Sequence, residues 1–173
     1  YQNYNWGYSR QHYAIMETTR GCPFSCTYCH IIFGKKTRYR TPENIVTEMK
    51  TLIDNYGVTE FYFSDDIFNI NTNRAIEIYD RIIKDKLDVK IHYPNGLRGD
   101  IMTEEFIDKM VEAGTVAVAY AIETPNLRLQ KYMKKRVKLD KLEKVIEYTC
   151  DKSIMVRLFF MYGLPTETEE DVN

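Results

Sequence analysis

The chain of 173 residues has almost no net charge and no long hydrophobic stretch, and each absence excludes a class of protein. Lysine and arginine total 24 against 25 acidic residues, so the net charge of −1 gives the chain no general attraction to nucleic acid or anionic membranes. No apolar run approaches the ~18 residues that a membrane-spanning helix needs, and no signal-peptide pattern is present. We expect one domain with a substantial core and no membrane partner.

Cysteine is also scarce, and only three of the four cysteines lie close together, at Cys22, Cys26 and Cys29. Their spacing is not that of a disulfide framework. The paired zinc motif and the four-cysteine ferredoxin motif need a fourth nearby ligand, and His30 stands too close to Cys29 to complete a tetrahedral zinc site. Three thiolates on one loop suit a 4Fe–4S cube with one iron left open. Because such a loop needs reducing surroundings, we expect a cytoplasmic protein.

Apolar periodicity predicts that strands and helices alternate along the rest of the chain. The expected strands cover residues 13–18, 59–64, 89–93, 115–122 and 154–162. The expected helices begin near residues 42, 73, 103, 126 and 139. Five alternations with short connections indicate βαβ units and a parallel sheet, whose carboxyl-terminal strand ends are where sites form. Cys150 falls in an apolar row of the last of these helices and is expected in the core.

The two ends of the chain predict that it is part of a longer protein. Residues 1–12 are polar and aromatic without periodicity, which favours a connector from a missing upstream domain. Residues 166–173 resemble a helix cap followed by one acid-rich turn, after which the chain stops. Residues 13–173 are therefore expected to form a core domain that is incomplete at its carboxyl end.

Several motifs in order resemble the radical S-adenosylmethionine (radical SAM) enzymes, closest to the cobalamin-dependent and methylthiotransferase-like group. They are the C-x3-C-x2-C loop with an aromatic before its last cysteine, and the segments 39–43, 63–68, 95–100, 121–124 and 163–168. The resemblance covers residues 13–173. It implies an α/β fold, a partial (βα)6 TIM-like barrel of which this chain holds about five βα units.

The resemblance implies an enzyme in which Cys22, Cys26 and Cys29 hold a 4Fe–4S cluster. The open iron of the cluster binds S-adenosylmethionine, and an electron then cleaves that cofactor to methionine and a 5′-deoxyadenosyl radical, which abstracts hydrogen from a substrate. An external electron donor of the flavodoxin or ferredoxin type is implied. In the cobalamin-dependent group a cobalamin would be bound by an upstream domain. The sequence does not define the substrate.

The resemblance also assigns cofactor-binding positions near the strand ends. Tyr28 corresponds to a residue that packs beside the adenine, and Glu123 to a carboxylate that holds the ribose hydroxyls. Asp65 and Asp66 stand where the methionine ammonium is bound, and strand alternation favours Asp66 as the more lumenal of the two. Which aspartate contacts the cofactor stays open. Gly163 would let the backbone approach the adenine, although the family motif has glycine where Thr166 stands here.

Two arginines and a run of basic residues need an explanation of their own. Arg157 interrupts the apolar fifth expected strand, so it must find an anion, either a protein acid or a carboxylate of cofactor or substrate. Arg98 follows the third expected strand and is also expected to bind the cofactor. The basic run over 128–138 invites an RNA-binding interpretation, but a solvated helix end explains it more simply.

Strand alternation makes one geometric prediction about the fourth expected strand. Ala117, Ala119, Ala121 and Glu123 share one face, and the bulky residues share the other. A buried parallel strand normally carries large residues on both faces. We therefore expect the alanine face to border a pocket that is continuous with the cysteine loop.

Three functions follow from these observations. The first is the core of a cobalamin-dependent methyltransferase or cyclase, and the second is a methylthiotransferase-like enzyme that modifies RNA or protein. The third belongs to another class, a non-catalytic iron–sulfur or zinc module for electron transfer or nucleic-acid binding.

Overall fold

The structure is a computed structural model that describes residues 12–172. One parallel sheet contains β1 (Tyr13–Met16), β4 (Glu60–Phe63), β5 (Lys90–Leu97), β6 (Thr115–Glu123) and β7 (Met155–Phe160) in the order β1-β4-β5-β6-β7. A separate antiparallel ribbon pairs β2 (Thr19–Arg20) with β3 (Arg38–Tyr39). The predicted parallel sheet is confirmed. The expected connector over residues 1–12 lies, except for its last residue, outside the described residues.

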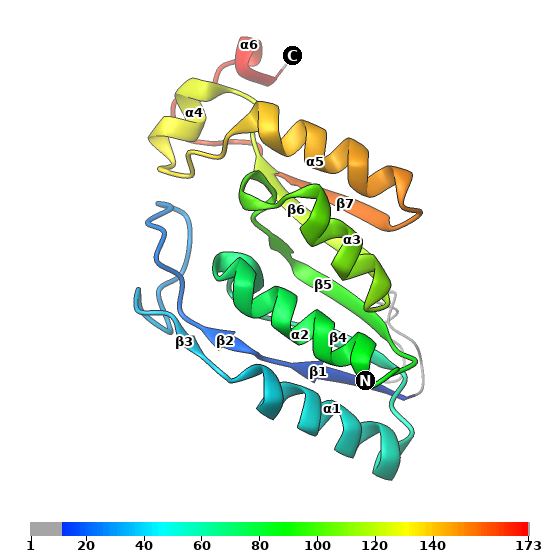
Figure 1. The fold of residues 1–173 in the computed structure, drawn as a ribbon. Helices are drawn as coiled ribbons and strands as arrows, with labels where there is room; N and C mark the ends of the chain where they lie inside the picture. Colours follow the sequence, from blue (N-terminus) through cyan, green and yellow to red (C-terminus); the bar gives the residue numbers. More distant parts are fainter. Residues whose placement is uncertain (1–11, 173) are drawn as a thin grey trace.

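The helices cover one face of this sheet. They are α1 (Pro42–Tyr56), α2 (Thr72–Lys84), α3 (Glu104–Glu112), α4 (Leu127–Tyr132), α5 (Leu139–Asp151) and α6 (Glu169–Val172), with short 3-10 turns η1 (Phe68–Ile70) and η2 (Gly99–Ile101). Figure 1 shows α1, α2, α3 and α5 side by side on that face. A doubly wound sheet has helices on both faces, whereas a barrel wall has them only outside. The sheet therefore has the form of a barrel wall with five βα units. None of the helices that the structure describes is long and apolar enough to cross a membrane.

Helix α1 shows how the sequence sets the element boundaries. The Thr41 hydroxyl accepts a hydrogen bond from Asn44 N at 3.2 Å, and Pro42 occupies the first turn. Gly57, at φ 64°, ends the helix in the left-handed conformation that glycine adopts without steric cost. The predicted start and stop of this helix are confirmed.

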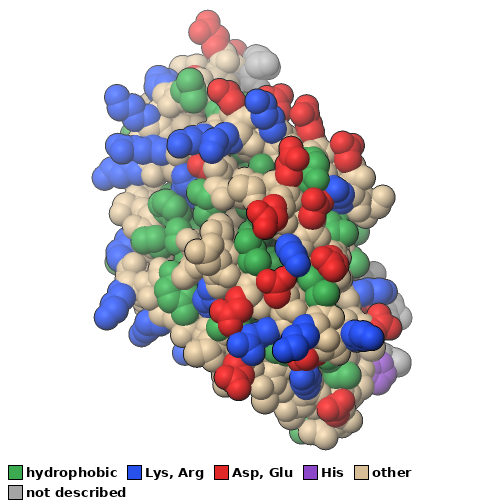
Figure 2. Space-filling view, in the orientation of Figure 1, with side chains coloured by type: hydrophobic (Ala, Val, Ile, Leu, Met, Phe, Trp, Pro, Cys, Tyr) green, Lys and Arg blue, Asp and Glu red, His purple; other side chains and the backbone are tan. Residues whose placement is uncertain are grey.

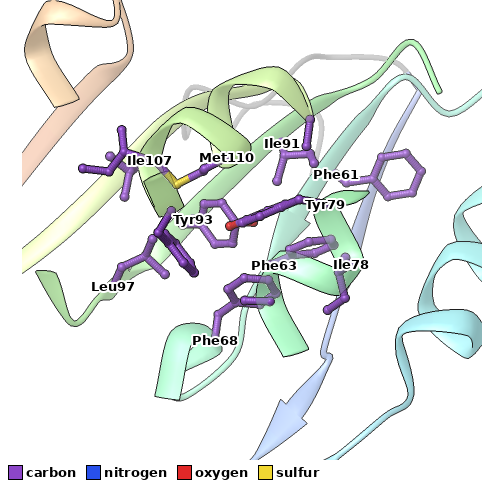
Figure 3. Close-up of a cluster of buried hydrophobic side chains, with 14 of the residues drawn as sticks. Phe61, Phe63, Phe68, Ile78, Tyr79, Ile91, Tyr93, Leu97, Ile107 and Met110 are labelled. Atoms are coloured by element: carbon purple, nitrogen blue, oxygen red, sulfur yellow. The ribbon is translucent and has the colours of Figure 1, made fainter. Parts of the chain in front are cut away.

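The core lies between the sheet and helices α2 and α3. Figure 3 shows Phe61 and Phe63 of β4 and Tyr93 of β5 packed against Tyr79 of α2, all almost fully buried. The two buried hydroxyls of Tyr79 and Tyr93 hydrogen-bond each other at 2.8 Å, so neither is left unsatisfied. This packing holds the strands in register and so fixes where their carboxyl ends lie.

Strand β6 presents its two faces as alternation predicts. Val118 and Tyr120 are part of the core under the helices, and the Tyr120 hydroxyl hydrogen-bonds Thr149 of α5 at 2.9 Å. Ala119 is buried on the opposite face. The prediction that Cys150 lies in the core is wrong, because Thr149 takes the buried position beside it and Cys150 is exposed.

Strand β7 is an edge of the sheet within the described residues. Four large apolar side chains of this strand are exposed, namely Met155, Leu158, Phe159 and Phe160. Exposed apolar surface of this kind marks a place where other protein packs.

Candidate cluster and cofactor site

The three clustered cysteines lie on the loop between β2 and β3, and all three line one cavity at the carboxyl ends of the strands. They are free thiols. The base of the loop is closed by the hydrogen bond from Cys22 N to Gly34 O at 3.2 Å. A Cβ at Gly21 would lie 2.6 Å from the carbonyl oxygen of Lys36, so the loop can close here only around glycine.

The surroundings of the loop favour protonated thiols. Burial raises the pKa of the Cys22 thiol and of the Cys29 thiol, and the neighbouring Cys26 raises both further. Metal binding therefore has to displace protons from these thiols. Among the described residues no three His, Cys, Asp or Glu side chains are grouped closely enough for one metal ion. A cube binds each thiolate through a different iron, so the three thiols suit a 4Fe–4S cluster better than a single zinc ion.

The structure separates the roles of the two neighbouring aspartates. Asp65 is buried, and its Oδ1 accepts hydrogen bonds from Thr18 N at 2.8 Å, from the Thr18 hydroxyl at 2.9 Å and from Thr19 N. Burial raises the pKa of Asp65, against the effect of these hydrogen bonds. Asp66 instead lines the cavity, where its Oδ2 accepts from Gly21 N at 3.0 Å. Asp65 therefore fixes the turn into the cysteine loop, while Asp66 faces the cavity as alternation predicts.

Glu123 lines the same cavity and contacts the cysteine loop. Its Oε1 accepts a hydrogen bond from the Tyr28 hydroxyl at 2.9 Å and contacts Lys135 Nζ at 3.1 Å. Burial and the Glu123 charge both raise the pKa of Tyr28, which keeps the phenol protonated as the donor. Glu123 also has a φ of 67°, a conformation that is costly for a residue with a side chain and is concentrated at functional sites.

Lys135 is the cavity residue that the sequence interpretation missed. Its side chain is 12% exposed and lines the cavity, and its neighbours Lys134 and Arg136 both adopt positive φ, at 57° and 52°. The interpretation of the basic run as a solvated helix end is wrong for this residue. No local pattern distinguishes Lys135 from the lysines around it, because its orientation depends on the contact with Glu123.

Arg98 is fully engaged by protein groups. Its guanidinium pairs with Asp100 at 2.8 Å, donates to the carbonyl oxygens of Lys135 at 3.2 Å and Arg136 at 3.0 Å, and lies 4.1 Å from the centre of the Phe24 ring. Phe24 belongs to the cysteine loop. Through these protein contacts Arg98 joins the cysteine loop to the loop that carries Lys135. Its assignment to the cofactor stays a prediction.

The remaining two predicted cofactor residues lie outside this cavity. Arg157 lies beside Ala119 in the register of β6 and β7 and does not line the cavity. Gly163, at φ 75°, donates its N–H to Glu167 Oε2 at 2.5 Å, and a Cβ there would meet nothing within 4 Å. Thr166 adopts φ 71°, so this loop keeps the left-handed backbone that glycine would favour, braced by Arg128, which donates to the Thr166 carbonyl at 2.8 Å.

Both apolar side chains, among them Phe24, Leu97 and Leu142, and smaller or polar ones line the cavity. Ala121 lines it, whereas Ala117 and Ala119 lie further down the same face of β6 and do not. The predicted pocket beside the alanine face is therefore confirmed for Ala121 alone. Asn95 also lines the cavity and donates to Ser64 O at 2.7 Å, which ties β5 to the end of β4. The cavity holds about 150 Å³, less than the ~300 Å³ at the lower end of small-molecule sites.

The fold is a barrel wall with a three-thiol loop after its first strand and carboxylates at the ends of later strands. This arrangement is that of an α/β-barrel protein that holds a thiolate-bound cluster beside a small cofactor. The chain belongs to the radical SAM superfamily, whose family model matches residues 16–173. The predicted family and fold class are thereby confirmed.

Named relatives extend this result. An uncharacterized methyltransferase of Pyrococcus horikoshii is 30% identical over 162 residues, covering 92% of this chain and 35% of that protein. Cytidylyl-2-hydroxyethylphosphonate methyltransferase of Streptomyces wedmorensis is 33% identical over 151 residues, covering 86% of this chain and 28% of the relative. The chain thus spans about a third of the length of these relatives. Further relatives carry the names of an anaerobic magnesium-protoporphyrin IX monomethyl ester cyclase and of methylthiotransferases.

Solved structures show the same fold. The radical SAM methyltransferase TsrM from Kitasatospora setae, with cobalamin and a 4Fe–4S cluster bound, superposes with a TM-score of 0.83 at 19% identity. The match covers 94% of this chain and 33% of that one.

Proposed function

We propose that this chain is the catalytic core of a radical SAM enzyme, within a cobalamin-dependent methyltransferase or cyclase. Cys22, Cys26 and Cys29 would hold a 4Fe–4S cluster, which when bound supplies the electron for reductive cleavage of S-adenosylmethionine. The observation that carries the proposal is that these three thiols share one cavity with the carboxylates of Asp66 and Glu123.

We assign different groups of S-adenosylmethionine to different residues of the chain. Asp66 is the carboxylate assigned to the methionine ammonium, because Asp66 lines the cavity, whereas Asp65 does not and its Oδ1 accepts from the backbone of Thr18 and Thr19. Glu123 is assigned to the ribose hydroxyls, since a carboxylate accepts from two neighbouring hydroxyls at once. Tyr28 and Lys135 both contact Glu123 Oε1, which leaves Oε2 available to accept from the ribose.

The relatives support the choice within the superfamily. Two of them are named methyltransferases and one a cyclase, and a methyltransferase with this fold binds cobalamin. We assign a cobalamin to a domain upstream of residue 13, with residues 13–173 as the radical SAM core. A methylthiotransferase-like modifying enzyme is the second candidate, because relatives with that name match as well. The sequence upstream of residue 1 separates them, since the second candidate carries a further cluster there.

The proposal includes a partner and a compartment. Radical SAM enzymes need an external reductant and a substrate, and we assign a flavodoxin- or ferredoxin-type protein as the reductant. Because a thiolate cluster persists only in reducing surroundings, we place the protein in the cytoplasm.

The test is anaerobic reconstitution of the protein with iron and sulfide. We expect roughly four irons and four sulfides per chain, a spectrum that changes when S-adenosylmethionine is added, and cleavage of the cofactor under reduction. Alanine at Cys22, Cys26 or Cys29 should abolish all three. Cys150→Ala is the matched control and should leave them intact. An intact cluster in Cys26→Ala, or one tightly bound zinc in place of iron, would refute the proposal in favour of a non-catalytic metal module.

A further inference from the structure

The cysteine loop and the ribbon at its base form a cationic surface with an apolar centre. Residues 18–42 contain no aspartate or glutamate, although the whole chain carries a net charge of −1. In the middle of this segment Ile31 and Ile32 are 67% and 78% exposed. Its cations are Arg20, Lys35, Lys36, Arg38 and Arg40. The segment therefore combines exposed aliphatic side chains with charge of one sign.

The cations are held around the apolar centre by the fold. The Arg20 guanidinium lies 5.6 Å from the centre of the Phe33 ring, and Arg38 donates to the Phe33 carbonyl at 3.3 Å. Arg20 and Arg38 are also directly opposite in the ribbon, an arrangement of like charges that costs stability. Glu17 pairs with Arg20, whereas no acid among the described residues forms an ion pair with Lys36 or Arg38. Arg40 pairs with Glu48, so of these five cations the charges that no ion pair among the described residues neutralises are those of Lys35, Lys36 and Arg38.

A second group of cations extends this surface. The hydrogen bond from Thr27 N to Met133 O, at 2.9 Å, joins the cysteine loop to the end of α4. The exposed cations beyond that contact are Lys131, Lys134, Arg136 and Lys138, together with Arg128, which pairs with Asp171. Figure 2 shows Lys and Arg gathered above and below a hydrophobic area, along the edge where Figure 1 places the loops after the strands. Acidic side chains are more frequent over the helices.

We propose that this surface docks an acidic one-electron donor protein, an inference that rests on the proposed function. An apolar centre within a charged rim is the anatomy of a protein–protein interface, and the rim selects a partner of opposite charge. Ile31 follows Cys29 by two positions, so a protein bound here lies next to the cluster loop. The donor gives up one electron and the cluster accepts it, with no bond made or broken. RNA is disfavoured because single-stranded RNA is held by stacking on several aromatic rings, whereas the two most exposed apolar side chains of the segment are Ile31 and Ile32 and its one exposed phenylalanine, tyrosine or tryptophan side chain is Tyr39.

The test compares two reductants on the full, anaerobically reconstituted protein. The acidic donor is reduced flavodoxin, and the control reductant is photoreduced deazaflavin, which is small and uncharged. The test variants are Lys36→Glu with Arg38→Glu, and separately Ile32→Gln. The matched control is Lys144→Glu, an exposed lysine of α5 on the helical side. The measured quantity is the second-order rate constant of cluster reduction at several salt concentrations.

We expect the charge-reversed double variant to slow reduction by flavodoxin on the order of tenfold at low salt, with a weaker salt dependence. Ile32→Gln should slow it at all salt concentrations, because loss of apolar contact is not screened. Lys144→Glu should have no effect, and deazaflavin should reduce every variant at the same rate. Equal flavodoxin rates for all variants would overturn the inference, as would loss of transfer-RNA binding in the double variant with unchanged flavodoxin rates. A protein that deazaflavin reduces but that never cleaves S-adenosylmethionine would refute the proposed function and not the docking surface.

Discussion

Replacing Arg98 by alanine tests whether this residue positions the site or binds a ligand. The substitution leaves the buried carboxylate of Asp100, whose side chain is 4% exposed, with only Lys138 N at 3.1 Å as a partner. Removing one member of a buried ion pair costs about 3–5 kcal/mol, and losing the Phe24 face adds about 1 kcal/mol. We expect the free energy of unfolding to fall by about 5 kcal/mol in total.

Two further variants divide this loss into its parts. Arg98→Lys keeps a charge for Asp100 but loses the planar fork that reaches the carbonyls of Lys135 and Arg136, so we expect a loss of about 1–2 kcal/mol. Phe24→Leu removes only the ring beneath the guanidinium. A double-mutant cycle between Arg98→Lys and Phe24→Leu should give a coupling free energy of about 1 kcal/mol.

The assay is urea unfolding of the cluster-free protein followed by circular dichroism, together with the spectral response of the reconstituted cluster to S-adenosylmethionine. If Arg98 positions the site, the Arg98→Lys protein should still bind the cofactor, with a perturbed cluster spectrum. Its loss of unfolding free energy should then change when Phe24 is also replaced. The reasoning is refuted if Arg98→Ala costs less than about 1 kcal/mol while cofactor binding is abolished. That result would make Arg98 a ligand of the cofactor.

Three more predictions concern the cavity, the last loop and the response to pH. Ala121→Leu should weaken S-adenosylmethionine binding by tenfold or more in calorimetry, with a stability loss below about 2 kcal/mol, because it fills a small cavity open on one side; an unchanged affinity would contradict this. Thr166→Gly should keep or raise stability by up to about 1 kcal/mol, because glycine adopts positive φ freely and this gain offsets the lost Arg128 contact; a loss above about 1 kcal/mol would show that this contact dominates. Burial lowers the pKa of His92 below its ordinary value of 6.5, so the unfolded chain binds a proton that the folded chain does not, and stability falls as pH drops below 6.5. His92→Gln should remove that part of the pH dependence, and identical urea midpoints against pH for both proteins would contradict it.

The order of strands and helices follows from the sequence because its signals are local. The cap at Thr41, the stop at Gly57 and the alternation of β6 each depend on residues within a few positions of one another. The cysteine loop is equally local, since Cys22, Cys26 and Cys29 lie within eight positions. The amino-acid sequence alone therefore determines these features, and with them the family and the fold class.

The roles of the residues around that loop are decided only by tertiary contacts. Tyr28 meets Glu123 across 95 positions, and Asp65 meets Thr18 across 47. Strand alternation predicts that Asp65 and Asp66 point to opposite faces. Only the tertiary structure shows that Asp65 accepts a hydrogen bond from Thr19 N, while Asp66 lines the cavity and accepts one from Gly21 N. Lys135 looks like any lysine in a basic run until the fold brings it to Glu123. A charged side chain takes its role from the partner that the fold supplies, and partners distant in sequence leave no local pattern.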